Sequence, residues 1–395
     1  MKNLCALMLC LFSFVSTSLA AEQEALEIWT SSESVKKAIE NATAGFSKEY
    51  GAKIKITVLS KDLTSLFKTA AVAGKGPDIF AWAHDVIGDL AESGLIEPVA
   101  LSPELKKAFL PVALNAFTYR GKVYGYPYDV EALALIYNKK LIAKAPSSME
   151  EVVKFSLDLK KKNNGQYGFL YDLNNFFFSF PFISAGGGYI FKDTNGTLNA
   201  KDIGLANEGA VKGVEFIKSL KDQEIVPGST DRSAAFTKMK EGKLAMTIDG
   251  PWALNELKQN NVSYGIAPIP TLNGKQPRPF VGTHGFIIRR SSKNKDLAKV
   301  LIEQYLVSKK GILALYQADP RGPSRADAIA ELSKDNVDLR QFMESAKNGV
   351  PMPNIPAMGA VWNAMGSALM LTITGKELPK KALEHAKTQI LSQVK

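Results

Sequence analysis

Cysteine is nearly absent from this chain of 395 residues. Its two cysteines, Cys5 and Cys10, lie in a leading segment that has a basic start, an apolar run and small residues at its end. This pattern is typical of a cleaved secretory signal peptide, so we expect residues 1–20 to be removed on export. Leu9 stands directly before Cys10, where lipoprotein processing requires a different context. Residues 21–395 contain no cysteine, which excludes disulfides and thiol catalysis in the exported chain.

Long apolar runs and clustered metal-binding residues are also lacking. No segment after residue 20 approaches the length of a membrane span, so we expect a soluble protein outside the cytoplasm. The three histidines, His84, His284 and His385, are isolated in the sequence without the paired spacing of metal ligands. We therefore expect no metal and no cofactor, with His84 in a packing or supporting role and His385 on a helix surface. Gly186–Gly188 lacks the Lys and Ser/Thr of a phosphate-binding loop and favours a tight connection.

Positive charge is in excess, with 49 Lys and Arg against 39 Asp and Glu and a net charge of +10. Such an excess can indicate a nucleic-acid or anionic-surface partner. Here the densest runs, Lys36–Lys37, Lys160–Lys162 and Lys380–Lys381, end or flank predicted helices, where solvated lysine is expected. No nucleic-acid motif accompanies them, and we expect no nucleic-acid partner.

Tryptophan is rare, but three of the four lie in short polar-flanked segments far apart in the sequence: Trp82, Trp252 and Trp362. An aromatic ring can pack on the apolar face of a pyranose, while a nearby carboxylate such as Asp85 accepts hydrogen bonds from its hydroxyls. A single tryptophan is more often a packing residue. Three in matching contexts indicate a site for a sugar.

Predicted strands and helices alternate along the first part of the chain. Strands are expected at 26–29, 54–58 and 78–82, and helices at 34–50, 61–73 and 84–92. This alternation predicts a parallel sheet with helices on both faces, in which ligands bind at the carboxyl ends of the strands. Trp82 and Asp85 stand at such an end.

A second alternation runs from about Leu135 to Ile269, with strands expected at 168–171 and 244–248. Between the two halves lies an extended apolar run, 124–137, which carries Glu131. A strand at 285–288 then indicates that the chain returns to the first half, and a helix is expected from Lys295 to about Gln317. The chain is long enough for two such lobes.

Five segments of the chain resemble the periplasmic maltose/maltodextrin-binding proteins, the solute receptors of ABC sugar transporters. In chain order they are Gly76–Asp85, Val130–Asn138, Ala245–Trp252, Pro279–Gly282 and Met352–Pro356. The resemblance implies an α/β periplasmic binding protein fold with two lobes, each a mostly parallel sheet flanked by helices, joined by crossing hinge segments. It places residues 21–130 and 285–331 in the first lobe, and residues 134–280 and 338–395 in the second.

The resemblance also implies a function. A member of this family binds an oligosaccharide in the cleft between its lobes, closes on it and delivers it to the membrane permease subunits of the transporter. It is a periplasmic receptor and not an enzyme. A monomer is expected, and a chemoreceptor is a further candidate partner.

Residue by residue, the resemblance implies a site with two kinds of group. The rings of Trp82, Trp252 and Trp362 are expected to stack on glucosyl units, and Asp85 and Glu131 to hold hydroxyls. Three further positions of the expected cleft carry residues that differ from the family pattern: Glu33, Asn175 and Phe177.

Several charged groups of the family's cleft are missing here. Ser34 stands in place of a lysine, and Val86 and Gly366 stand where the family has arginines, while Asn363 replaces a tyrosine. A planar guanidinium group cannot be replaced by Val or Gly. We therefore expect weak maltose binding, with a longer maltodextrin or another saccharide preferred, unless other groups compensate.

Two other functions are consistent with these residues. The chain could be a receptor for a different sugar or a polyol. Asp85 and Glu131 could also form the carboxylate pair of a secreted glycosidase, although the resemblance favours binding. Turnover of a labelled oligosaccharide separates the enzyme from the receptor.

Overall fold

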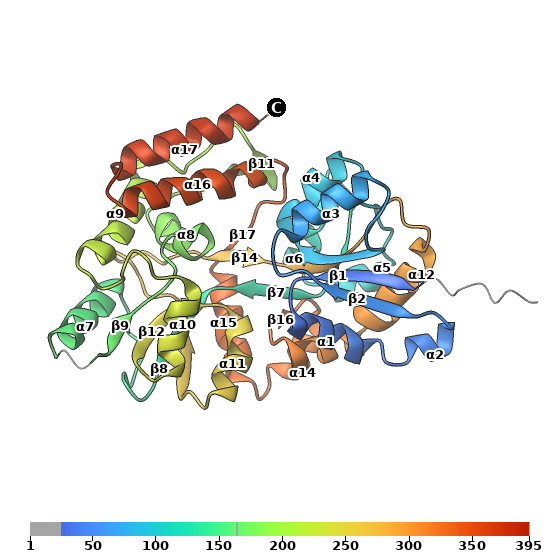
Figure 1. The fold of residues 1–395 in the computed structure, drawn as a ribbon, viewed down its shortest axis with the longest axis horizontal. Coiled ribbons are helices and arrows are strands. Elements are labelled where there is room, and N and C mark those ends of the chain that lie inside the picture. Colours follow the sequence, from blue (N-terminus) through green and yellow to red (C-terminus); the bar gives the residue numbers. More distant parts are fainter. Residues whose placement is uncertain (1–24, 163–164, 395) are drawn as a thin grey trace, which may run out of the picture.

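The computed structural model describes residues 25–162 and 165–394, and the signal peptide expected at residues 1–20 lies outside this part. Figure 1 shows two lobes side by side, with strands β7 (Asp129–Ala132) and β14 (Phe280–Gly282) running between them. No helix in the described ranges is both long and apolar enough to cross a membrane. The two-lobed α/β fold expected from the sequence is confirmed.

The first lobe is built on a five-stranded sheet in the order β2-β1-β3-β15-β6. Side chains of β3 alternate between two cores: Ile79 and Ala81 pack with residues of α1 and α13, and Phe80 packs with residues of α3 and α4. Because helices cover both faces, β3 is apolar over most of its length. The strands are β1 (Leu26–Thr30), β2 (Ile54–Val58), β3 (Ile79–Ala83), β6 (Tyr126–Pro127) and β15 (His284–Ile288).

Short helices surround this sheet, and Ser32 caps the first of them by accepting a hydrogen bond from the Val35 N–H. The helices are α1 (Glu33–Ala42), α2 (Phe46–Tyr50), α3 (Leu63–Val72), α4 (Ile87–Glu92), α5 (Pro103–Ala108), α6 (Pro111–Ala116), α12 (Lys295–Val300), α13 (Lys309–Ala318) and α14 (Ala326–Leu332). A 3₁₀ turn at His84–Val86, a π-helical stretch at Leu301–Leu306 and the hairpin of β4 (Thr118–Tyr119) and β5 (Lys122–Val123) complete the lobe.

The second lobe has a four-stranded sheet in the order β13-β8-β12-β9. Every residue of the central strand β12 is buried, so this sheet lies inside one large core. The strands are β8 (Ala134–Asn138), β9 (Tyr167–Phe169), β12 (Leu244–Asp249) and β13 (Tyr264–Ala267), with a separate hairpin of β10 (Lys192–Thr194) and β11 (Thr197–Asn199). The helices are α7 (Met149–Lys161), α8 (Phe176–Ala185), α9 (Glu208–Asp222), α10 (Arg232–Lys240), α11 (Leu254–Gln259), α16 (Met358–Ile373) and α17 (Pro379–Gln393), and a 3₁₀ turn covers Pro251–Ala253.

A third sheet crosses between the lobes in the order β16-β7-β14-β17, with β16 at Gly322–Pro323 and β17 at Val350–Pro351. Helix α15 (Val337–Lys347) lies beside it. Asp129 and Glu131 are two positions apart on β7, so their side chains point to the same face. Val130 points to the other face, into a small apolar core with Ala113 and Val281.

Three details differ from the sequence predictions. Both main sheets are mixed: only β2-β1-β3 and β12-β9 are parallel, because strands such as β15 return antiparallel after crossing from the other lobe. The helix expected at 34–50 is divided at Thr43, whose hydroxyl bonds the Ile39 carbonyl, into α1 and α2. The helix expected at 295–317 is divided at Ser308, which caps α13.

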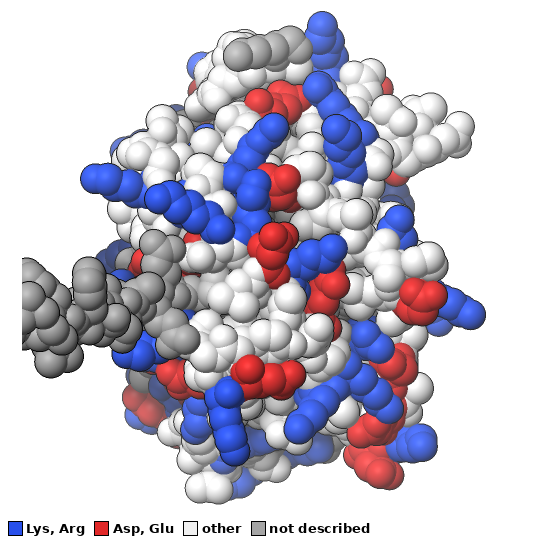
Figure 2. Space-filling model, turned by 90° about the vertical axis from the view of Figure 1, so that its right-hand side faces the viewer, with Lys and Arg blue, Asp and Glu red and all other residues white. Residues whose placement is uncertain are grey.

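Charged side chains are interleaved on the face that Figure 2 shows, with Lys and Arg beside Asp and Glu. Many charged residues of the described ranges form ion pairs, such as Lys55 with Glu27 at 3.1 Å and Lys68 with Asp89 at 2.7 Å. The excess of positive charge is therefore spread out on this face and not gathered into a single patch.

Candidate functional site

Residues from both lobes and from the crossing sheet form a continuous chain of contacts, which we call the contact ring because its two ends, Trp82 and Asp85, lie three positions apart in the sequence. It connects Trp82, His284, Glu131, Arg321, Trp252, Phe177, Phe280, Trp362 and Asp85. Six of these nine residues were predicted from the sequence to bind a ligand. Segments up to 280 positions apart in the chain thus meet around one site.

The first lobe contributes Trp82 and Asp85. Trp82 stands near the carboxyl end of β3, half-buried, with its ring edge-to-face with His284 at 6.5 Å. Asp85 lies in the 3₁₀ turn that follows and accepts a hydrogen bond of 3.0 Å from the Trp362 Nε1–H. Burial raises the pKa of Asp85, against the opposing effects of His84 and the Trp362 bond. The two walls of the site therefore touch directly at this point.

His84 holds this turn in place through contacts of both its ring nitrogens. It is buried, with Nε2 2.8 Å from the Met352 carbonyl and Nδ1 3.2 Å from the Thr283 N–H. Burial lowers its pKa, although Asp85 opposes the shift, and a neutral ring with its proton on Nε2 satisfies both bonds. His84 thus has the supporting role expected from the sequence, while His385 lies exposed on α17, also as expected.

The second lobe contributes an aromatic wall. Trp252 sits in the turn after β12, half-buried, 6.2 Å from the Phe177 ring. Phe177 stacks loosely on Phe280 at 5.9 Å, and Phe280 meets the Trp362 ring at 5.8 Å. Helix α16 carries Trp362 and packs its opposite side in the core. Rings that are only half-buried beside a carboxylate offer faces for a ligand.

Charged residues in or next to the crossing sheet form the floor of the site. Asp129, Glu131, His284 and Arg321 have side chains that are 4%, 8%, 14% and 16% exposed. Gly282 lies opposite Glu131 in the ladder, and a Cβ there would come within 3.0 Å of the Glu131 side chain. A glycine at this position therefore leaves the space that the carboxylate occupies.

Arg321 is the central cation of this floor. Its Nε donates to Glu131 Oε2 at 2.6 Å, and its Nη1 bonds Asp319. Its guanidinium carbon lies 5.5 Å from the centre of the Trp252 ring. The nearby carboxylates, Asp319 first, raise the pKa of Arg321 although burial opposes them. Arg321 therefore stays charged and joins the crossing sheet to the second lobe.

His284 was expected to be isolated, but in the structure it lies beside two carboxylates. Asp129 lies 155 positions earlier in the chain, yet its carboxylate accepts from the His284 backbone N–H at 2.7 Å and lies 3.0 Å from Nδ1. Burial acts to lower the pKa of His284, but Asp129 and Glu131 outweigh it and raise the pKa. The pKa of Asp129 is lowered in turn, mainly by His284, although burial opposes this.

Asp129, Glu131 and His284 have the spacing of a metal site, since their ligand atoms lie within 4.8 Å of one another. The guanidinium of Arg321 already provides a cation to both carboxylates, at 2.6 Å from Glu131 and 3.8 Å from Asp129. A metal ion would have to displace this group or bear its repulsion. The donor set therefore fits an internal ion-pair network better than a metal centre.

Two predicted residues lie outside the contact ring. Glu33 begins α1 with a side chain that is 77% exposed and an ion pair to Lys36 at 3.8 Å. Asn175 caps α8 by accepting from the Phe177 N–H at 3.0 Å. The next residue, Ser34, donates from its hydroxyl to Asp319, the second carboxylate that bonds Arg321, at 3.4 Å.

Sequence reasoning missed Asp129, Arg321 and Asp319. The signal for Asp129 was the two-residue period of a strand, which places it beside Glu131 on one face. Arg321 and Asp319 lie in a segment rich in Pro and Gly, where no periodic pattern assigns a face. Only the folded chain brings them to the floor of the site.

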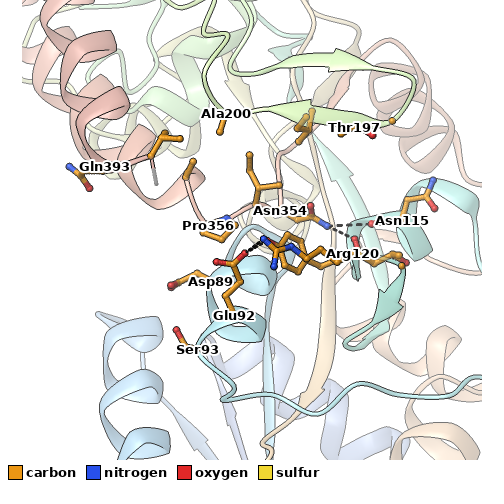
Figure 3. A pocket seen from close by; sticks show the side chains of 18 residues that line it. Asp89, Glu92, Ser93, Asn115, Arg120, Thr197, Ala200, Asn354, Pro356 and Gln393 are labelled. Atoms are coloured by element: carbon orange, nitrogen blue, oxygen red, sulfur yellow. Dashed lines mark hydrogen bonds and ion pairs between the residues drawn. The ribbon is translucent and has the colours of Figure 1, made fainter.

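A separate cavity of about 990 Å³ lies between the lobes and shares no residue with the contact ring. We call it the hairpin cavity because the hairpins β4–β5 and β10–β11 both line it; Figure 3 shows Glu92, Arg120 and Asn354 on its walls. Asn354 donates to the carbonyls of Ala116 and Thr118, both at 2.9 Å. Its lining is mostly polar and it has no tryptophan.

Comparison with known proteins gives one family. Residues 41–341 match the family described as bacterial extracellular solute-binding protein. The chain is 31% identical over 385 residues to the galactooligosaccharide-binding protein of Bacillus subtilis (strain 168), covering 94% of this chain and 89% of that protein.

Two further relatives have related names. The maltooligosaccharide ABC transporter solute-binding lipoprotein of Streptococcus pneumoniae (strain ATCC BAA-255 / R6) is 32% identical over 376 residues, or 92% of this chain and 87% of that protein. The maltotriose-binding protein of Pyrococcus abyssi (strain GE5 / Orsay) is 30% identical over 316 residues, or 78% of this chain and 68% of that protein.

Proposed function

Because this chain belongs to the family of bacterial extracellular solute-binding proteins, we propose that it binds an oligosaccharide in the contact ring and delivers it to the permease of an ABC transporter. The observation that carries the proposal is the ring itself, in which three half-buried tryptophans from two lobes surround paired carboxylates. Aromatic faces and hydrogen-bonding carboxylates are the two groups that a pyranose needs. The names of the relatives support an oligosaccharide of the malto or galacto type.

Binding is proposed to stabilise a closed arrangement of the lobes. Trp82 and Asp85 come from one side of the crossing sheet and Trp252, Phe177 and Trp362 from the other. A ligand that touches both sides favours the arrangement in which they are close, by its differential affinity for that state. The lobes proposed to move are residues 21–130 with 285–331 and residues 134–280 with 338–395, and the crossing sheet is the hinge.

Export by a cleaved signal peptide and a periplasmic location are part of the same proposal. The leading segment and the extracellular family support them. Mass spectrometry of the exported protein should find Ala21 or a near neighbour at the amino terminus, and sedimentation should find a monomer. A lipid-modified or membrane-retained product would contradict the proposal.

A sugar panel tests the function directly. Purified protein is titrated with maltose, maltotriose, longer maltodextrins, galactobiose, longer galactooligosaccharides and unrelated disaccharides, by calorimetry and thermal shift. We expect an oligosaccharide of three or more units to raise the melting temperature most, because a ligand bound only by the folded state stabilises it. Stacking grows with the number of sugar rings, whereas the lost arginines would have held only particular hydroxyls.

The same purified protein is used to test whether the chain is a glycosidase. Glu131 is held by Arg321 at 2.6 Å and Asp85 by Trp362 at 3.0 Å, so both carboxylates are occupied by structural partners. We expect a labelled oligosaccharide to remain intact after prolonged incubation with the protein. Chain-shortened products that disappear in a Glu131→Gln variant would establish hydrolysis and overturn the receptor function.

A further inference from the structure

We propose that Arg321 contacts the bound oligosaccharide directly and determines which saccharide the contact ring accepts. This inference rests on the proposed function and names the group that decides its specificity.

The position of Arg321 places it beside any sugar that packs on Trp252. The guanidinium carbon is 5.5 Å from the centre of that ring. Two planar groups in full face-to-face contact lie closer, at about 3.5–4 Å, so the guanidinium lies over the ring without stacking fully on it. A pyranose that packs on the remaining surface of Trp252 would therefore lie next to Arg321.

The guanidinium has a donor left for such a hydroxyl. Of its three nitrogens, Nε bonds Glu131 and Nη1 bonds Asp319, whereas no hydrogen-bond partner of Nη2 is found among residues 25–162 and 165–394. The side chain is 16% exposed, and Nη2 is not among the buried polar atoms that lack a partner in the described ranges, so solvent reaches this nitrogen. A ligand oxygen can replace that solvent and accept a hydrogen bond from Nη2.

The same two carboxylates hold the guanidinium in one orientation. Glu131 lies on β7 and Asp319 lies just before β16, so both are fixed by the crossing sheet or its flank. A planar fork that is already ordered loses little entropy on binding and donates in fixed directions. Such a donor distinguishes an equatorial from an axial hydroxyl at the same carbon, which is the difference between glucosyl and galactosyl units.

The first test replaces the planar guanidinium group of Arg321 and keeps its positive charge. Arg321→Lys is titrated with the preferred saccharide of the panel, with its epimer, and with deoxy analogues that each lack one hydroxyl. We expect affinity for the preferred saccharide to fall by roughly 10- to 100-fold, the effect of one hydrogen bond to a charged group. The matched control is Arg325→Lys, because Arg325 pairs with Asp327 at 2.8 Å and lies outside the ring; its affinity should equal that of wild type.

The analogues separate direct contact from a structural role. In wild type, one deoxy analogue should bind more weakly than the parent sugar, and in Arg321→Lys this difference should vanish. If Arg321→Lys loses the same affinity for the parent sugar and for every analogue, the role of Arg321 is overturned and the proposed function stands. The same holds if the variant loses no affinity while wild type binds sugar. If wild type binds no saccharide of the panel, the proposed function fails and this inference fails with it.

A measurement on the wild-type protein covers the case in which the lysine variant does not fold. The structure of the complex with the preferred saccharide should place Arg321 Nη2 within about 3.2 Å of a sugar oxygen. A complex in which no sugar oxygen comes within about 3.5 Å of this nitrogen would overturn the proposal.

Discussion

The contact ring and the hairpin cavity both lie between the lobes, yet they differ in chemistry. The cavity has a volume of about 990 Å³ and a mostly polar lining, and its Arg120–Glu92 pair has side chains that are 75% and 40% exposed. The ring has tryptophan faces and an Arg321–Glu131 pair that is 16% and 8% exposed. Solvent has access to the first pair and is largely excluded from the second. The candidate site is therefore distinguished from the cavity by excluded water and aromatic faces.

Breaking one ion pair in each region gives the largest expected difference. Arg321→Met leaves the Glu131 and Asp319 carboxylates nearly buried without their cation, and we expect the free energy of unfolding to fall by about 3–5 kcal/mol. Arg120→Met breaks the exposed pair with Glu92 and should cost about 0–1 kcal/mol. Urea unfolding of both variants measures the two losses. Equal losses would mean that the two regions do not differ in how far they exclude water.

Removing aromatic rings tests the contact ring by its effect on sugar affinity. Trp82→Ala, Trp252→Ala and Trp362→Ala should each weaken oligosaccharide binding by roughly 2–4 kcal/mol, as truncation of an aromatic hot spot does. This corresponds to about 30- to 1000-fold in dissociation constant. Calorimetry measures the effect.

The fourth tryptophan provides the matched control for these variants. Trp29 is half-buried in β1, bonds Glu27 at 3.1 Å and takes part in none of the contacts that define the ring. Trp29→Ala should lower the melting temperature and leave the affinity unchanged. The ring would be structural if its three variants bound sugar as tightly as Trp29→Ala does.

The sequence predicted the walls of the site better than its floor. Trp82 and Asp85 stand at the carboxyl end of β3, where the visible apolar run predicted the end of a strand. Trp252 follows the buried strand β12, which was also expected as a strand. The floor depends on β7, β14 and β16, which have only two to four residues each. Strands this short carry too little periodicity to show which side chains share a face or which partners they meet.

The same limit explains what was missed in the fold. Alternation of strands and helices predicted two α/β lobes, but local pattern contains no information on the direction in which a strand from a distant segment is added. β15 enters the first sheet about 200 positions after β3 and runs antiparallel to it. The ion pair of Arg321 with Glu131 spans 190 positions and has no local signal at all.

The protonation of His284 should give a smaller, pH-dependent effect in the contact ring. Its pKa is raised by Asp129 and Glu131 although burial opposes them. A raised histidine pKa contributes stability fully below the unfolded value of about 6.5, and this contribution is lost as the pH rises through the higher folded value. The difference in unfolding free energy between wild type and His284→Gln should therefore shrink above about pH 6.5, with a slope of at most ~1.4 kcal/mol per pH unit.

Asp129→Asn tests the cause of this pH dependence. It removes the carboxylate that lies 3.0 Å from His284 Nδ1, and with it the largest influence that raises the histidine pKa. We expect this variant to lose most of the pH-dependent difference measured by urea unfolding at a series of pH values. A difference that persists unchanged in Asp129→Asn would show that the carboxylate is not its source.

The smallest effect is expected from metal ions, because Arg321 already supplies the cation of the floor. Asp129, Glu131 and His284 have ligand atoms within 4.8 Å of one another, a set that zinc accepts in other proteins. The guanidinium nitrogen at 2.6 Å from Glu131 opposes a second cation there, so zinc or a chelator should leave the melting temperature and the sugar affinity of wild type unchanged. Arg321→Met removes this opposition and should gain stability when zinc is added, whereas Arg321→Met with His284→Gln, which lacks one ligand, should not. Zinc stabilisation of wild type that is lost in His284→Gln would show instead that the floor is a metal site and that the guanidinium yields to the ion.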